Sequence, residues 1–190
     1  MWCSSSLRID ASALNRAVVM LANIPGAAEK AEKTAIKKTV KGIRRFAAQK
    51  VREEYTIQGK YVTRTLSASF NGASGELRSK GGVNDLRYFK TNPKNRTKRK
   101  PRNGIFVQVR RGGGGGRLPH AFIAGMDSGH VGVFERVGRS RLPIKKMTGP
   151  STPSMLASPN VSEKVAEKME ERLNVNVDHE INAFLNGFRG

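Results

Sequence analysis

An amphipathic stretch between Ala27 and Tyr55 constrains the fold of this chain more than any other feature. Apolar residues recur there at three- or four-residue spacing, while lysine and arginine cover most of the remaining surface. The apolar stripe consists of Ile36, Val40, Ile43, Ala47 and Val51. At about 1.5 Å per residue, such a helix would be about 40 Å long. A rod of this length in a chain of 190 residues predicts a helical spine for the fold.

Helices are also predicted near both ends of the chain. Asp10 is a suitable N-cap, and apolar residues over 14–21 repeat at helical spacing. Towards the C-terminus, Ser158 followed by proline predicts the start of another helix. Apolar residues then recur over 161–188, with 174–176 as the place where this helix could break. We expect this amphipathic helix to dock on its own domain rather than on a partner.

The middle of the chain has the alternating pattern of β-strands. Short runs at 62–70, 75–79 and 85–89 are separated by glycines in turn positions. The clearest strands are 105–110 and 131–136. Helices at the ends and short strands between them predict an α+β fold with a small antiparallel sheet. We expect a single domain over 1–190, helical over 1–60, β-rich over 61–150 and closed by a helix over 158–190.

The charge of the chain indicates an anionic partner. There are 35 Lys and Arg against 15 Asp and Glu, so the net charge is +20. Self-repulsion on this scale is typical of proteins that bind nucleic acid, an acidic membrane surface or an acidic protein. Residues 161–190 hold six acids and four bases, whereas residues 1–160 hold 9 acids and 31 bases. The longest apolar run has six residues, where a membrane span needs about 20, so we expect no membrane partner.

A flexible basic insert is predicted over 92–117. Residues 92–104 are polar, basic and interrupted by prolines, and 112–116 are five consecutive glycines. We expect this insert to become ordered only on assembly and to touch DNA phosphates through charge alone; the alternative is a solvated loop. The DNA-contact candidates are Lys94, Arg96, Lys98, Arg99, Lys100, Arg102, Arg110 and Arg111.

No catalytic or metal-binding pattern emerges from the sequence. Cys3 is the single cysteine, and His120 and His130 have no carboxylate or thiolate at ligand spacing. Asp127 and Ser128 lie too close to His130 in the sequence for the three to form a catalytic triad, and residue types of this kind are typical of a turn. The pentaglycine lacks the Lys-Ser or Lys-Thr of a phosphate-binding loop. We therefore expect no enzymatic activity, no metal and no cofactor; a nuclease would need an acid cluster.

The most informative stretch is an ordered series of short motifs between residues 118 and 155. Ala-Phe-Ile-Ala is followed by Gly-His-Val-Gly-Val-Phe-Glu-Arg, then Arg-Leu-Pro-Ile, then Gly-Pro-Ser. Physically these are a buried strand or turn, a hairpin into a second strand, a rigid start to another strand, and a turn towards the terminal helix. The residues expected to build the fold and subunit contacts are Phe122, Val133, Phe134, Glu135, Arg136, Leu142, Pro143, Ile144, Gly149, Pro150 and Ser151.

This series resembles the minor tail protein Z family of long-tailed phages, the lambda-type tail-completion proteins. The resemblance is close over 118–155, and the length and the helices agree over nearly the whole chain. It implies a non-enzymatic virion protein of a siphophage, made in the host cytoplasm and added at the head-proximal end of the tail. It also implies a homo-oligomeric ring around the DNA channel, beside the tail terminator and head–tail connector proteins. The alternative is a generic nucleic-acid-binding protein whose affinity depends on salt.

Overall fold

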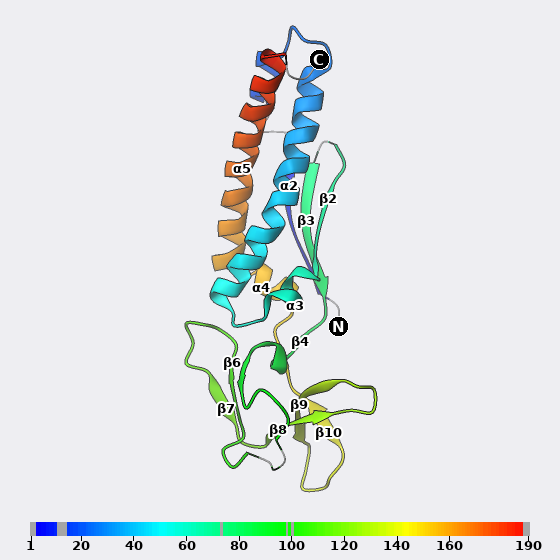
Figure 1. The fold of residues 1–190 in the computed structure, drawn as a ribbon, viewed down its shortest axis with the longest axis vertical. Coiled ribbons are helices and arrows are strands. Elements are labelled where there is room, and N and C mark those ends of the chain that lie inside the picture. The colour runs from blue at the N-terminus through cyan, green and yellow to red at the C-terminus, as the bar shows by residue number, and fades with distance from the viewer. Residues whose placement is uncertain (1–2, 11–14, 73, 98, 100, 188–190) are drawn as a thin grey trace.

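Two long antiparallel helices with a three-stranded sheet beside them form one half of the molecule, and smaller antiparallel sheets form the other half (Figure 1). The computed structural model describes residues 3–10, 15–72, 74–97, 99 and 101–187. Helices account for 42% and strands for 28% of the structure, so the predicted α+β class is confirmed. Within the described residues, no helix is long and apolar enough to cross a membrane.

Helix α2 (Ala27–Glu54) is the predicted spine. It starts after Gly26, whose φ of 70° lies in the left-handed region that favours glycine, and it ends where Tyr55 turns to extended backbone. All five residues of the predicted apolar stripe are buried, because that stripe faces the C-terminal helix on one side and a sheet on the other (Figure 1). The exposed lysines and arginines occupy the remaining surface of the helix.

Helix α5 (Pro159–Leu185) begins at the predicted Ser158-Pro159 and packs along α2, so its expected docking on its own domain is confirmed. The break considered at 174–176 does not occur. The two asparagines there have partners on neighbouring helices: Asn176 Nδ2 donates to Thr39 Oγ1 at 2.8 Å, and Asn174 Oδ1 accepts from Arg16 Nη2 at 3.1 Å. These contacts satisfy the polar side chains without interrupting the helix.

The N-terminal prediction needs two corrections. Residues Cys3–Asp10 form strand β1, so Asp10 ends a strand, and the following helix α1 is short (Asn15–Met20). Ala17 and Leu21 are buried as the spacing predicts, but Val18 is half exposed, and Leu14 lies outside the described residues. The strand forms because it pairs with a distant segment of the chain, which local spacing does not reveal.

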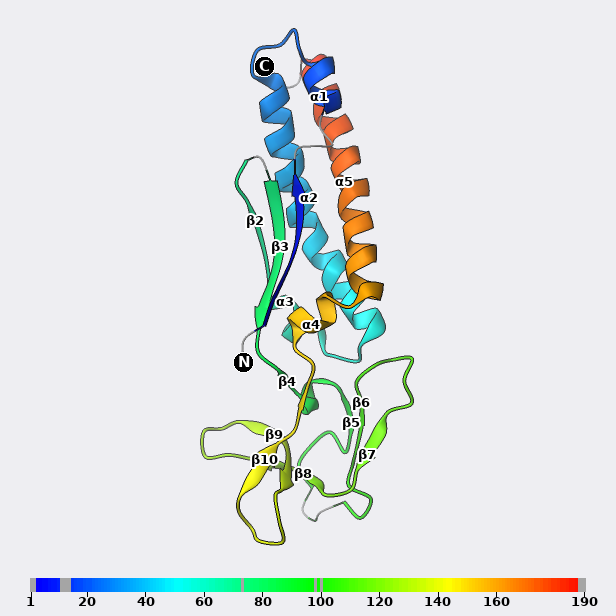
Figure 2. The ribbon, with the colours of Figure 1, turned by 180° about the vertical axis from the view of Figure 1, so that it is seen from behind.

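A three-stranded antiparallel sheet covers the other side of α2 (Figure 2). Its order is β1–β3–β2, with β3 (Ser74–Gly81) in the centre and β2 (Leu66–Phe70) on the far edge. The strand predicted over 62–70 is divided, because residues Gly59–Thr63 form the short helix α3. At Gly75 the sheet lies so close to α2 that a Cβ atom would stand 2.1 Å from Val40 Cγ2.

The β-rich end holds three small antiparallel sheets instead of the one predicted. The first two contain three strands each, and the third contains two. The first sheet consists of β5 (Lys90–Asn92), β6 (Ile105–Gln108) and β7 (Gly116–Leu118). The second consists of β8 (Ala121–Gly125), β9 (Val131–Arg136) and β10 (Ile144–Lys146). The third consists of β4 (Asn84–Asp85) and β11 (Thr148–Gly149). The strand predicted at 85–89 is therefore a two-residue strand followed by a 3-10 turn, η2 (Leu86–Tyr88). One buried apolar cluster joins both halves, since it contains Val51 of α2, Ile105 of β6 and Val133 of β9.

Candidate interaction surface

The hairpin β8–β9 is the centre of the motif series, and its predicted pairing is confirmed. Phe122 of β8 lies opposite Phe134 of β9, with ring centroids 6.5 Å apart. Phe134 and Val133 are buried, whereas Phe122 is half-buried and has the guanidinium of Arg136 above its ring at 5.8 Å. The turn predicted at 127–130 is present, with Gly129 at a φ of 76°. Because directly paired residues of a hairpin share one face, both rings lie on the same side of it, Phe134 covered and Phe122 partly open to solvent.

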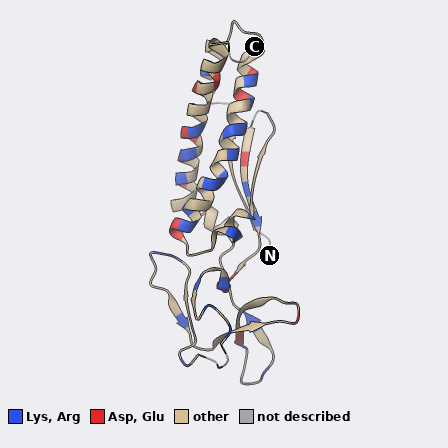
Figure 3. Ribbon diagram, in the orientation of Figure 1, with Lys and Arg blue, Asp and Glu red and all other residues tan. Residues whose placement is uncertain are grey.

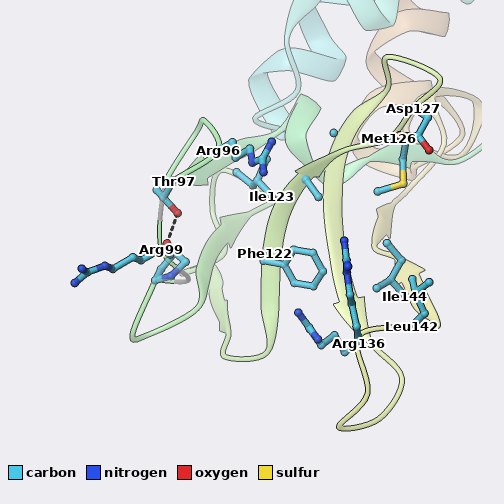
Figure 4. Close-up of a pocket in the computed structure, with 14 residues that line it drawn as sticks. Arg96, Thr97, Arg99, Phe122, Ile123, Met126, Asp127, Arg136, Leu142 and Ile144 are labelled. Atoms are coloured by element: carbon cyan, nitrogen blue, oxygen red, sulfur yellow. Dashed lines mark hydrogen bonds between the residues drawn. The ribbon is translucent and has the colours of Figure 1, made fainter.

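A groove of about 640 Å³ lies between this hairpin and the basic insert (Figure 4). The insert supplies Arg96, Thr97, Arg99 and Pro101 to one wall, β8 supplies the floor, and the end of β9 with the following loop supplies the other wall. Residues of the basic insert and of the motif series, which are separate in the sequence, therefore meet in this groove. Arg96 and Arg99 come from the DNA-contact candidates, and Phe122, Arg136, Leu142 and Ile144 come from the motif series.

The groove is basic at its walls and apolar at its floor. Four arginines line it, Arg96, Arg99, Arg136 and Arg141, against a single acid among the lining residues, Asp127. The turn of the insert is held by Thr97 Oγ1, which donates to the carbonyl oxygen of Arg99 at 2.6 Å (Figure 4). Such a surface suits a ligand that carries both negative charge and apolar groups.

The other candidates of the insert lie in different surroundings. Lys94 and Arg102 are exposed, whereas Lys98 and Lys100 lie outside the described residues. Arg111 is tied to the end of α2, where its Nε donates to the carbonyl oxygen of Arg52 at 2.6 Å. The guanidinium of Arg110 stands 5.7 Å above the ring of Tyr55. A cation beside helix carbonyls is stabilising, and an aromatic ring attracts a cation above its face, so Arg111 and Arg110 have a local structural role as well.

A second basic surface runs along α2. Exposed lysines and arginines follow its solvent-facing side over 30–45, as Figure 3 shows. Lys37 stands 5.2 Å above the ring of Phe70, and Arg44 Nη2 donates to the carbonyl oxygen of Thr63 at 2.8 Å. These contacts hold the long side chains against β2 and α3, respectively, while their charge stays near solvent.

The last motif residues serve the fold. Gly149 pairs with Asn84, and the carbonyl oxygen of Pro150 accepts from Asn84 Nδ2 at 2.8 Å. Ser151 is the N-cap of helix α4 (Thr152–Leu156), where its Oγ accepts from the backbone N–H of Ser154 at 3.2 Å. The predicted turn towards the terminal helix is thus built on a short capped helix.

Sequence reasoning missed a buried polar cluster where the two halves join. The Asp85 side chain is completely buried and lies 2.9 Å from His130 Nε2 and 3.4 Å from Lys146 Nζ. It also accepts from the backbone N–H of Arg87 at 2.9 Å. A Cβ at Gly132 would stand 2.6 Å from Asp85 Oδ2, which explains a glycine between His130 and Val133. The cluster joins β4, β10 and the turn before β9, which are distant in the sequence, so no local spacing could reveal it.

The described part of the chain holds no group of three His, Cys, Asp or Glu side chains that could bind a metal. Its excess of lysine and arginine is presented on exposed surfaces, chiefly the insert and α2. The model of the family described as prophage minor tail protein Z (GPZ) matches residues 12–188, nearly the whole chain. The chain therefore belongs to this family and is a structural protein of the phage tail. No curated protein and no solved structure gives a significant match.

Proposed function

We propose that this protein completes the head-proximal end of a siphophage tail and prepares it for joining to the DNA-filled head. In this proposal it is made in the host cytoplasm, assembles as a homo-oligomeric ring around the DNA channel, and contacts the tail terminator and head–tail connector proteins. Family membership supports the location in the tail. The role of the protein is architectural, without a catalytic step or a cofactor.

The distribution of positive charge supports the proposed contact with DNA. Between residues 86 and 126 there are eleven bases and no acid, and α2 presents a second basic surface. Repetition of these surfaces around a ring multiplies the positive charge. Like charges around an empty lumen repel one another, and DNA relieves that repulsion. The assembled ring should therefore be more stable with DNA in its channel.

The insert residues outside the groove are the proposed DNA contacts, with Lys94 and Arg102 as the ones that the described structure leaves most exposed. Contacts of this kind act through phosphate charge and carry no sequence preference. Replacing Arg102 by alanine should weaken DNA binding equally for all sequences. Each lost phosphate contact should reduce the dependence of log K on log salt by about 0.9.

Gene deletion followed by complementation tests the proposed function. We expect the deletion phage to make separate heads and tails without infectious particles, and a plasmid copy of the gene to restore infectivity. Intact tails and full infectivity after deletion would refute the proposal. A purified monomer that binds DNA tightly at about 100 mM salt without any tail defect in the deletion phage would favour the generic nucleic-acid-binding protein instead.

A further inference from the structure

The groove beside Phe122 has a mixed chemistry that DNA phosphates do not need. Its floor is apolar, and Leu142 at its edge is 66% exposed although it is a large hydrophobic side chain. Arg136 stands over the Phe122 ring, and Figure 4 shows the two side chains next to each other. A phosphate backbone would pair with the arginines but would leave this apolar surface uncovered. A polypeptide with acids around a small apolar residue would cover both.

The same chain offers such a surface on α5. Glu163, Glu167 and Glu170 are exposed and recur at four- and three-residue spacing, so they share one face of the helix. That face points away from the core, because the buried residues Val161 and Val165 lie on the opposite side.

These three glutamates differ from the other exposed acids of α5. Glu171 pairs with Lys168 at 2.5 Å, and Asp178 pairs with Arg16 at 3.5 Å. Among the described residues, no ion pair involves Glu163, Glu167 or Glu170. The small, exposed Ala166 adjoins them on the helix surface. We call the three glutamates with Ala166 the acidic stripe.

We propose that the groove of one copy binds the acidic stripe of a second copy, an inference that rests on the proposed ring. Charge complementarity selects this occupant: the groove has four arginines against one acid, and the stripe has three acids. The stripe occupies the half of α5 nearest the β-rich end, the end that holds the groove (Figure 1). Because groove and stripe are different surfaces, the contact is head-to-tail, and repetition of such a contact forms a ring when the rotation between neighbours closes.

Site-directed crosslinking tests the contact itself. In a Cys3→Ser background, a Leu142→Cys chain is mixed with an Ala166→Cys chain and treated with a short bis-maleimide. We expect the mixed dimer as the main product, and a chain that carries both cysteines to give higher oligomers. Val175→Cys is the matched control, since it is exposed on another face of α5. Equal crosslinking to the control, or no crosslinking of the Ala166→Cys chain, would overturn the proposal.

Charge reversal tests the chemistry. Arg136→Glu with Arg141→Glu in the groove, or Glu163→Arg with Glu167→Arg in the stripe, should weaken self-association about tenfold in sedimentation at low salt. A chain with all four changes should recover it. The matched control, Arg139→Glu with Glu29→Arg, changes exposed charges outside both surfaces and should behave like the wild type. Circular dichroism checks that each variant is folded.

The possible results separate the interface from the proposed function. A wild-type chain that stays monomeric at every concentration would overturn the interface, as would failure of the four-change chain to recover. Groove variants that lose DNA binding but keep self-association would assign the groove to DNA and also overturn it. If crosslinking and charge exchange succeed but the polypeptide is missing from virions, the interface stands and the proposed function fails.

Discussion

Lys38 Nζ of α2 lies 2.5 Å from Oε1 of Glu180 on α5, and the Glu180 side chain is completely buried. The lysine is 40% exposed, so the pair spans from solvent to the core between the two long helices. Just below it, Thr39 and Asn176 form a hydrogen bond across the same helix pair. These two polar contacts fix how α2 and α5 align.

Replacement of Lys38 by methionine should destabilise the protein by about 2–4 kcal/mol, because a buried carboxylate then loses its ammonium partner. Urea denaturation measures the free energy of unfolding. Lys41→Met is the control, since Lys41 is exposed on the same helix. The double variant Lys38→Met/Glu180→Leu should regain most of the loss. A single variant as stable as the control would contradict the role given to this pair.

The close approach of the sheet to α2 predicts a large effect at Gly75. The methyl group of an alanine would stand 2.1 Å from Val40 Cγ2 and 2.9 Å from Ile36 Cγ2, both buried. We expect Gly75→Ala to lower the free energy of unfolding by about 1–3 kcal/mol through overpacking. Gly138→Ala is the control, because a Cβ there has no atom of the described structure within 4 Å. Equal melting temperatures for the two variants would show that the sheet can move aside.

The buried cluster at Asp85 predicts that this carboxylate holds the junction of the two halves. Asp85→Ala removes the acceptor for His130, Lys146 and the backbone N–H of Arg87. The free energy of unfolding should fall by about 2–4 kcal/mol. Asp127→Ala, in an exposed turn, should have little effect. Hydrogen exchange should accelerate first in β4, β9 and β11, and unchanged protection of these strands would speak against the assignment.

Two glutamates of α2 should respond to pH in opposite ways. Burial, with a smaller effect from Glu29, raises the pKa of Glu32 above its usual 4.5, so the folded state binds this proton more tightly than the unfolded state. Its contribution to stability is present in acid and is lost as pH rises. Glu32→Gln should therefore be more stable than the wild type at neutral pH, and the difference should vanish below about 4.5.

Glu53 supplies the opposite case. Hydrogen bonds from Lys50 and Gln49 lower the pKa of its carboxyl, so its contribution is present at neutral pH and is lost as pH falls. Glu53→Gln should then be less stable than the wild type at neutral pH and equal to it in acid. Thermal melts between pH 3 and pH 7 compare the variants. The same pH trend for both would contradict these signs.

Elements whose signal lies within one segment could be predicted from the sequence. The apolar stripe of α2 and the alternation in β6 each repeat over enough residues to fix the element and its buried face. Strand β1 was not predictable in this way. Its serine-rich sequence offers only Leu7 and Ile9 as apolar residues, and it becomes a strand by pairing with β3 about 70 residues away.

The interaction surface was predictable only as separate parts. Arg96 and Leu142 each belong to a segment that the sequence singles out, but their shared groove depends on the path of the chain through β6 and β8. The bond of Arg111 to the end of α2 and the pairing of Asp85 with His130 also join segments that are distant in the sequence. Contacts between distant segments leave no periodic pattern, so they require the fold.

Imaging of the neck in purified phage particles tests the central claim most directly. We predict a ring of this α+β subunit between the tail tube and the head connector, with its basic insert towards the DNA and α5 of each copy against the groove of the next. Particles that lack the polypeptide, or that carry it away from the head-proximal end of the tail, would contradict the account.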